Sequence, residues 1–192
     1  KKKDKDIIIT FVGGGPSLKN NLEELRKHKI IVACGSVYDY LINNNIIPTY
    51  CVLCDPDKVT EKYIQKANDK TKFLVASCCD EIVFNKLKDK EIILWHCFSE
   101  EMSSTIKEYD PGSEWIGGGC TVGLRAMCIF IMLGYTNLHF FGFDSSLDET
   151  QHHAYEFATK DEELGKIYDV KIGMGVNKEE KVYHCAGYHM AQ

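Results

Sequence analysis

The sequence predicts a single α/β domain built on a doubly wound, mostly parallel sheet. Its candidate strands are continuous apolar runs, which is typical of strands that helices cover on both faces. These runs alternate with helical stretches along most of the chain. The length of 192 residues, with 44% hydrophobic residues, suits one large domain with a substantial core. Together, these three observations predict a Rossmann-like architecture.

Four strand–helix pairs are expected in the first half of the chain. The first strand, at 7–12, ends in three glycines and Pro16, and a polar helix is expected after them. Each later pair repeats this order of an apolar run, a short turn and a helix. The four pairs are expected at 7–12 and 17–27, 30–34 and 37–45, 50–54 and 59–67, and 73–76 and 80–87.

The remaining core elements follow an irregular stretch in the middle of the chain. A fifth strand is expected at 92–95, before that stretch. Three glycines at 117–119 then precede a long apolar helix over 121–133. Gly134 ends this helix, because glycine readily takes the left-handed conformation found after helix ends. The last strand of the core is expected at 138–141.

The predicted core occupies residues 7–145 and follows a polar tail at 1–6. Residues 146–192 break the alternation, because they are polar and carry four of the seven histidines. Two short apolar runs within them, at 168–172 and 181–185, predict a hairpin. We interpret this segment as a substrate-facing extension of the core. Because it ends without a closing element, we expect the chain to be part of a longer protein.

Composition argues against several classes of partner and environment. The chain has 23 Lys and Arg against 28 Asp and Glu, a net charge of −5, so a nucleic-acid partner is not expected. The longest apolar run, at 122–133, is shorter than the roughly 20 residues that cross a bilayer. No signal peptide is recognised at the N-terminus. Several of the nine cysteines lie in apolar runs, which predicts reduced thiols and a cytoplasmic location.

Two glycine-rich segments are the first candidate binding elements. Ligands of parallel sheets bind beyond the carboxyl ends of the strands, and both segments open a helix at that edge. Exposed amides at a helix start favour phosphate, although a plain tight turn is the alternative at 13–17. Neither segment is a G-x-G-x-x-G fingerprint or a Walker loop. The candidate phosphate-binding residues are Gly13, Gly14, Gly15, Ser17, Gly118, Gly119 and Thr121.

Two aspartates that end strands are the second group of candidates. Asp55 and Asp144 could each bind Mg²⁺ or a ribose hydroxyl, or could cap the next helix. A helix cap is a serious alternative for Asp55, because Pro56 follows it. A carboxylate at 144 with His153 shortly after it suits proton transfer near neutral pH. The C-x-x-C at 51–54 lies on a strand, where its cysteines point to opposite faces, so no metal site is predicted.

Seven short motifs in this order resemble a known family, the MptE-like Rossmann domains. That family includes the archaeal 6-hydroxymethylpterin diphosphokinase and motility-accessory glycosyltransferase domains. The same skeleton is similar to the bacterial family 42 sialyltransferases, which use CMP-sialic acid. The resemblance spans roughly residues 7–155. Its motifs are V-G-G-G-P-S-L at 12–18, A-C-G-S at 33–36, I-P-T-Y at 47–50, D-P at 55–56, G-C-T-V-G at 119–123, L-G-Y at 133–135 and G-F-D at 142–144.

The resemblance implies a nucleotide ligand, either a CMP-sugar or ATP, across the strand ends. It assigns the phosphates to 13–17, the nucleoside to Gly35, Ser36 and Asp55, and a phosphate or donor sugar to 119–121. The pterin enzymes transfer diphosphate from Mg²⁺–ATP, whereas the sialyltransferases need no metal. This chain departs from the sialyltransferases at Gly35 and Ser36, where those enzymes carry an asparagine for the nucleotide.

A histidine is the base that the resemblance implies for sugar transfer. His153 matches the histidine that follows the family's G-x-D motif, and the sialyltransferase base lies further along the chain. His184 or His189 could take that second position. With Asp144, the histidines His153 and His184 form the candidate catalytic set.

These observations favour a nucleotide-dependent transferase with a small-molecule donor and a hydroxyl acceptor. Sialyltransferase-like glycosyl transfer to a glycan is preferred, because the histidine-rich extension suits an acceptor base. Transfer of diphosphate from ATP to a hydroxymethylpterin is the alternative. A non-catalytic nucleotide-binding module is a further alternative, since one fold hosts many functions.

Overall fold

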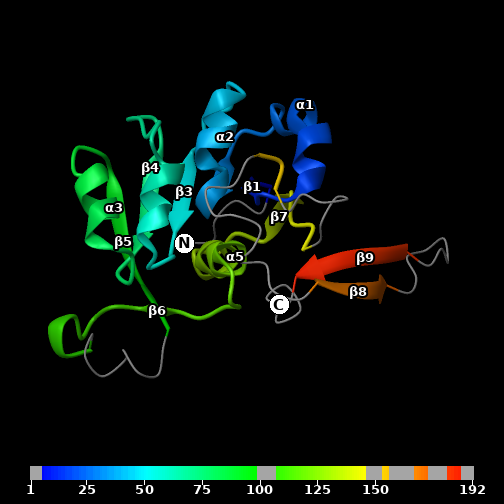
Figure 1. The fold of residues 1–192 in the computed structure, drawn as a ribbon. Coiled ribbons are helices and arrows are strands. Elements are labelled where there is room, and N and C mark those ends of the chain that lie inside the picture. Colours follow the sequence, from blue (N-terminus) through cyan, green and yellow to red (C-terminus); the bar gives the residue numbers. More distant parts are fainter. Residues whose placement is uncertain (1–5, 99–106, 146–152, 156–166, 173–180, 187–192) are drawn as a thin grey trace.

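A computed structural model describes residues 6–98, 107–145 and 153–155, together with the backbone of 167–172 and 181–186. Its main feature is a sheet of seven parallel strands in the order β6-β5-β4-β3-β2-β1-β7 (Figure 1). The predicted doubly wound α/β class is therefore confirmed. The strands are β1 Ile8–Val12, β2 Ile31–Cys34, β3 Tyr50–Leu53, β4 Lys72–Ala76, β5 Ile92–Cys97, β6 Trp115–Ile116 and β7 Asn137–Phe141.

The strand order reverses once, between β1 and β7. From β1 to β6 each strand pairs with the one before it, so the chain moves steadily toward one edge of the sheet. It then returns to the opposite edge, where β7 pairs with β1 over the full length of both strands. In open α/β sheets such a reversal is the place where ligands bind, outside the carboxyl ends of the strands.

The helices form two layers on the two faces of the sheet. Because strand–helix–strand connections are right-handed, the helices between β1 and β5 cover one face and α5 covers the other (Figure 1). Phe130 of α5 packs edge-on against Phe11 of β1 and Tyr50 of β3. The helical elements are η1 Pro16–Asn20, α1 Leu22–Leu25, η2 Gly35–Val37, α2 Tyr38–Asn43, η3 Lys58–Tyr63, α3 Glu81–Lys86 and α5 Val122–Met132.

Two of the four helices predicted for the first layer were too long and too regular, whereas α3 lies within the predicted 80–87. The helix expected at 17–27 is a 3₁₀ turn followed by a four-residue α1, and the helix expected at 59–67 is the 3₁₀ segment η3. In contrast, α5 lies within the predicted 121–133. The two-residue strand β6 was not predicted, because two residues carry no periodic signal.

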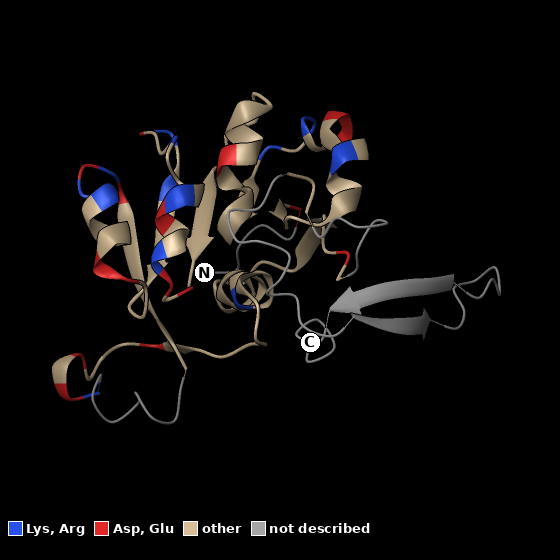
Figure 2. Cartoon of the chain, viewed as in Figure 1, with Lys and Arg blue, Asp and Glu red and all other residues tan. Residues whose placement is uncertain are grey.

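Charge is distributed unevenly between the two helical layers. Figure 2 shows Lys, Arg, Asp and Glu along α1, α2, η3 and α3, whereas Arg125 is the one charged residue of α5. An apolar helix across the middle of a sheet is expected to bury much of its surface. Accordingly Ala126, Ile129 and Phe130 are buried against the sheet.

The predicted hairpin in the extension is confirmed as backbone structure. Strand β8, Ile167–Ile172, pairs antiparallel with β9, Lys181–Ala186, and the two form a sheet of their own. Most of the remaining extension and the polar tail at 1–5 lie outside the described residues. Among the described residues, no helix is both long and apolar enough to cross a bilayer.

Candidate functional site

The loops that follow β1 and β7 touch each other at the strand reversal. The amide of Gly13 donates to the carbonyl oxygen of Phe141 at 2.8 Å, and that of Gly15 donates to Gly142 at 2.9 Å. A Cβ atom on Gly13 would lie 2.5 Å from the Gly142 oxygen, and one on Gly142 would lie 2.5 Å from the Gly13 oxygen. Gly142 also has a φ of +66°, which L side chains rarely adopt. Direct packing of two main chains therefore requires glycine in both loops.

Asp144 ties the β7 loop to the start of η1. Its carboxylate accepts from the Ser17 amide at 2.7 Å and from the Ser17 hydroxyl at 2.5 Å. Pro16 opens η1, as the sequence predicts, and its missing N–H leaves no donor unpaired at that position. A carboxylate thus occupies the place at this helix start that the sequence analysis assigns to a phosphate.

A short segment of the extension, residues 153–155, lies across the glycine loop. The amide of Ala154 donates to the carbonyl oxygen of Gly14 at 2.9 Å. The hydroxyl of Tyr155 forms a 2.6 Å hydrogen bond with the hydroxyl of Ser36, and burial raises the pKa of this tyrosine. The His153 ring lies beside Gly14. A Cβ atom added to Gly14 would be 2.8 Å from the Cδ2 atom of that ring. The extension therefore brings a histidine to the loop.

The start of α5 is built by a second set of glycines. Thr121 caps the helix, since its hydroxyl oxygen accepts from the Leu124 amide at 3.4 Å. Gly118 has a φ of +131°, and a Cβ on Gly119 would overlap the side chain of Leu124. The glycines thus let the chain turn tightly into the helix.

Phe143 connects the first glycine loop to the first turn of α5. Its ring lies 3.2 Å from the Cβ position of Gly13 and 2.5 Å from that of Gly123 in the first turn of α5. Val122, next to it, lies 3.1 Å from the Cβ position of Gly35 at the end of β2. The two segments therefore share one edge of the sheet. Gathered there are Gly13, Gly14, Gly15, Ser17, Gly35, Ser36, Thr121, Asp144 and His153.

Two candidate residues have other surroundings. The Asp55 carboxylate accepts from the Asp57 amide at 2.9 Å, and Asp57 is the residue that caps η3, through Val59. The helix cap considered for position 55 thus lies two residues further on. His184 belongs to β9, where its backbone pairs with Asp169, and its side chain lies outside the described part of the chain.

Tyr155 and Phe143 are site residues that the sequence analysis did not single out. Phe143 stands within the G-F-D motif, so its position could have drawn attention. Tyr155 follows a polar, histidine-containing stretch that carries no periodic pattern, and nothing in it signals a buried ring. Within the residues that the structure describes, no group of three or more His, Cys, Asp or Glu side chains is arranged to hold a metal ion.

Comparison with models of protein families places the chain in one family. The family model described as 6-hydroxymethylpterin diphosphokinase MptE-like matches residues 1–150. The chain belongs to the MptE-like family. The match covers both glycine-rich segments and Asp144 but not residues 153–155, so the segment that covers the loop lies beyond it.

A solved structure shows how far the fold is shared. The MAf glycosyltransferase from Magnetospirillum magneticum AMB-1 superposes with a TM-score of 0.70 at 18% sequence identity. The superposition covers 96% of this MptE-like chain and 28% of the glycosyltransferase chain. This chain therefore has the fold of one part of that larger protein. A search of curated proteins gave no match.

Proposed function

We propose that this MptE-like chain binds the nucleotide of an activated donor and forms part of a transferase. The observation that carries the proposal is the contact of Phe143 with both the first glycine loop and the first turn of α5, at the reversal of strand order. Membership of a family described by a diphosphokinase supports transfer chemistry in general. The free thiols of the described cysteines support a reducing compartment such as the cytoplasm.

The start of α5 is the better placed of the two segments for the phosphates. In the first loop, the amides of Gly13, Gly15 and Ser17 already donate to oxygens of the β7 loop. An α-helix leaves its first amides without partners in the helix, and its positive end attracts anions. We therefore place the donor phosphates against Gly118, Gly119 and the first turn of α5, with the first loop as the wall that positions them.

The nucleoside is placed along the ends of β2 and β3. Gly35 and Ser36 form the turn after β2, and Asp55 is an exposed carboxylate just after β3. A carboxylate at a strand end suits the hydroxyls of a ribose. The Ser36 hydroxyl is shared with Tyr155, so this turn also holds the segment that carries His153.

Glycosyl transfer to a hydroxyl acceptor is the reaction that we propose first. The glycosyltransferase superposition supports it, because it extends over nearly the whole chain and beyond the family match. His153 is the proposed base that takes the proton of the attacking hydroxyl, and the hydrogen bond from Ala154 to Gly14 fixes its backbone beside the loop. Asp144 is proposed to act by holding the loops together.

Transfer of diphosphate from ATP is the second candidate, and the description of the matching family favours it. Such a reaction uses Mg²⁺, which binds through one or two carboxylates together with the substrate phosphates. Asp55 and Asp57, both exposed after β3, fit that requirement. The ion would neutralise the charge of the phosphates. A Mg²⁺ site of this kind needs only one or two carboxylates from the protein, so Asp55 and Asp57 suffice without a third protein ligand.

A thermal-shift panel tests the proposal and separates its two reactions. The protein is melted alone and with CMP, CDP, UDP, ATP, and ATP plus Mg²⁺. A ligand at a hundredfold its dissociation constant stabilises the folded state by about 2.7 kcal/mol. Stabilisation by a cytidine nucleotide without metal supports glycosyl transfer, whereas a response that needs ATP and Mg²⁺ supports diphosphate transfer. If no nucleotide raises the melting temperature, the proposed site is wrong.

Replacement of the histidines tests catalysis separately from binding. We expect His153→Ala to abolish turnover with the donor identified in the panel while the thermal shift persists. His184→Ala is the matched variant for the second candidate base. Full activity in both variants, with binding intact, would show that neither histidine is the base.

A further inference from the structure

Four cysteines gather at the carboxyl ends of β3, β4 and β5, apart from the glycine loops. They are Cys54, Cys78, Cys79 and Cys97. The register of β4 and β5 continues past Ala76 and Trp95, because the Ser77 amide donates to the Trp95 oxygen at 2.9 Å. Cys78 lies in the turn that follows β4 and Cys97 ends β5, and their sulfur atoms are 3.8 Å apart.

Exposure distinguishes this pair from the buried thiols of β2 and β3. Cys34 and Cys51 are buried, and burial raises the pKa of Cys34 to about 12 and that of Cys51 well above its ordinary value. Thiols of that kind are inert. Cys78 and Cys97, by contrast, are both partly exposed, so a small molecule in solution can reach them.

The surroundings of Cys78 favour its thiolate, which is the reactive form of cysteine. Hydrogen bonding with the thiols of Cys79 and Cys97, together with the charge of Arg125, lowers the pKa of Cys78 against the opposing effect of partial burial. The Cys54 carbonyl oxygen, 3.2 Å from the Cys78 sulfur, accepts from the neutral thiol.

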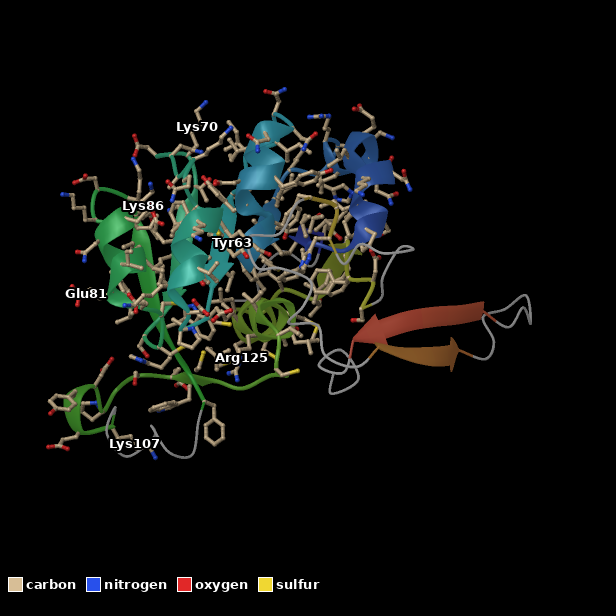
Figure 3. All side chains as sticks on the ribbon, in the orientation of Figure 1. Tyr63, Lys70, Glu81, Lys86, Lys107 and Arg125 are labelled. Carbon is tan, nitrogen blue, oxygen red and sulfur yellow. The ribbon has the colours of Figure 1, made fainter. Side chains whose placement is uncertain are left out.

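Arg125 is held in place by the neighbouring strand. Its guanidinium donates to the carbonyl oxygen of Ile116 in β6 at 3.3 Å, and Figure 3 shows the side chain projecting from α5 on that side. A fixed positive charge beside a partly exposed thiol is typical of reactive cysteines.

We propose that Cys78 and Cys97 form a redox pair that small disulfides, such as oxidised glutathione, convert into an intramolecular disulfide. The Cys78 thiolate attacks one sulfur of oxidised glutathione, forms a mixed disulfide and releases one glutathione thiolate. Cys97 then loses its proton to solvent and attacks the Cys78 sulfur, which releases the second glutathione. Two protein thiols are oxidised, and one small disulfide is reduced to two thiols.

The sulfur atoms of Cys78 and Cys97 start close to each other. Formation of the bond shortens their separation from 3.8 Å to about 2.05 Å. The inference does not depend on the proposed function, because it rests on the positions of the two sulfur atoms.

Peptide mapping after oxidation tests this proposal on the folded protein. The reduced protein is exposed to oxidised glutathione, remaining thiols are alkylated, and the digest is analysed by mass spectrometry. We expect a linked pair of peptides containing Cys78 and Cys97, lost on reduction. The Cys120→Ser background removes an exposed thiol that could otherwise form its own adduct. A native protein that yields no such link would overturn the proposal.

Three variants identify the roles within the pair. Cys97→Ser should stop the reaction at a glutathione adduct on Cys78, and Cys78→Ser should give neither adduct nor link. Cys128→Ser is the matched control, because it removes a partly exposed thiol of α5 outside this cluster and should leave the link intact. Zinc that co-purifies with the reduced protein and blocks oxidation would instead show a metal site, and would also overturn the proposal.

Discussion

At Gly14, a single missing Cβ atom decides whether the extension can reach the loop. A Cβ there would overlap the hydroxyl of Tyr155 and would lie 2.8 Å from the Cδ2 atom of His153. The sequence analysis assigns this glycine to the close approach of a phosphate. The structure adds that two side chains of the protein itself approach it closely.

We expect Gly14→Ala to destabilise the protein and to displace residues 153–155. Overpacking of a well-filled site costs about 1–3 kcal/mol. The loss should appear as a lower denaturation midpoint in urea, with faster hydrogen exchange at the Ala154 amide, which donates to Gly14. Gly112→Ala is the control, because a Cβ there meets nothing within 4 Å. Equal stability of both variants would show that residues 153–155 do not lie on the loop.

Among the elements, α5 joins the largest number of site features. Its first turn contacts the β2 turn through Val122 and the β7 loop through Gly123, and its buried face packs on β1 and β3. It is apolar enough to bury one face and begins with a residue that can cap it, so both ends were predicted within one residue. Stability of its first turn should therefore affect the whole edge.

We expect Thr121→Ala to destabilise the protein by about 1 kcal/mol, because the Leu124 amide loses the hydroxyl that caps it. Thr121→Ser keeps the hydroxyl and should behave like the parent protein. Urea denaturation of the three proteins measures the difference. If the serine variant loses as much stability as the alanine variant, the methyl group of Thr121 matters and the cap does not.

For the molecule as a whole, the bounds of the strands were easier to predict than their order in the sheet. Apolar runs mark strands because buried strands must be apolar, and β2, β3 and β4 begin and end within one residue of the prediction. The helices expected at 17–27 and 59–67 were mispredicted because packing on the sheet, and not the local pattern, sets their length. Strand order depends on contacts between distant residues, so the position of β7 beside β1 was not foreseen.

The same reasoning separates the predictable part of the candidate site from the rest. Glycines, Asp144 and Thr121 stand directly after or before strands and helices, and alternation alone places them at one edge. The bond between Ser17 and Asp144 joins residues that are 127 positions apart, and the bond between Ser36 and Tyr155 spans 119 positions. No local pattern encodes such pairs, which depend on where β7 inserts.

Phe130 tests how far the whole molecule depends on the second helical layer. Phe130 is 2% exposed. The centroid of its ring lies 5.5 Å from that of Phe11 and 5.3 Å from that of Tyr50, so it packs α5 against the sheet. Phe130→Ala should cost about 3–5 kcal/mol, a large part of the roughly 5–15 kcal/mol that stabilises a typical protein. We therefore expect a strongly reduced urea midpoint.

Phe140 provides the comparison within the same aromatic cluster. It stacks on Phe11 at 5.4 Å but is 44% exposed, so its removal leaves a smaller cavity and returns less apolar surface to water. Phe140→Ala should thus cost clearly less than Phe130→Ala. If the two variants unfold at the same urea concentration, the packing of Phe130 between α5 and the sheet is not a main source of stability. Because α5 links β6 to β7 across the sheet, a large loss at Phe130 should also remove any thermal shift by nucleotides.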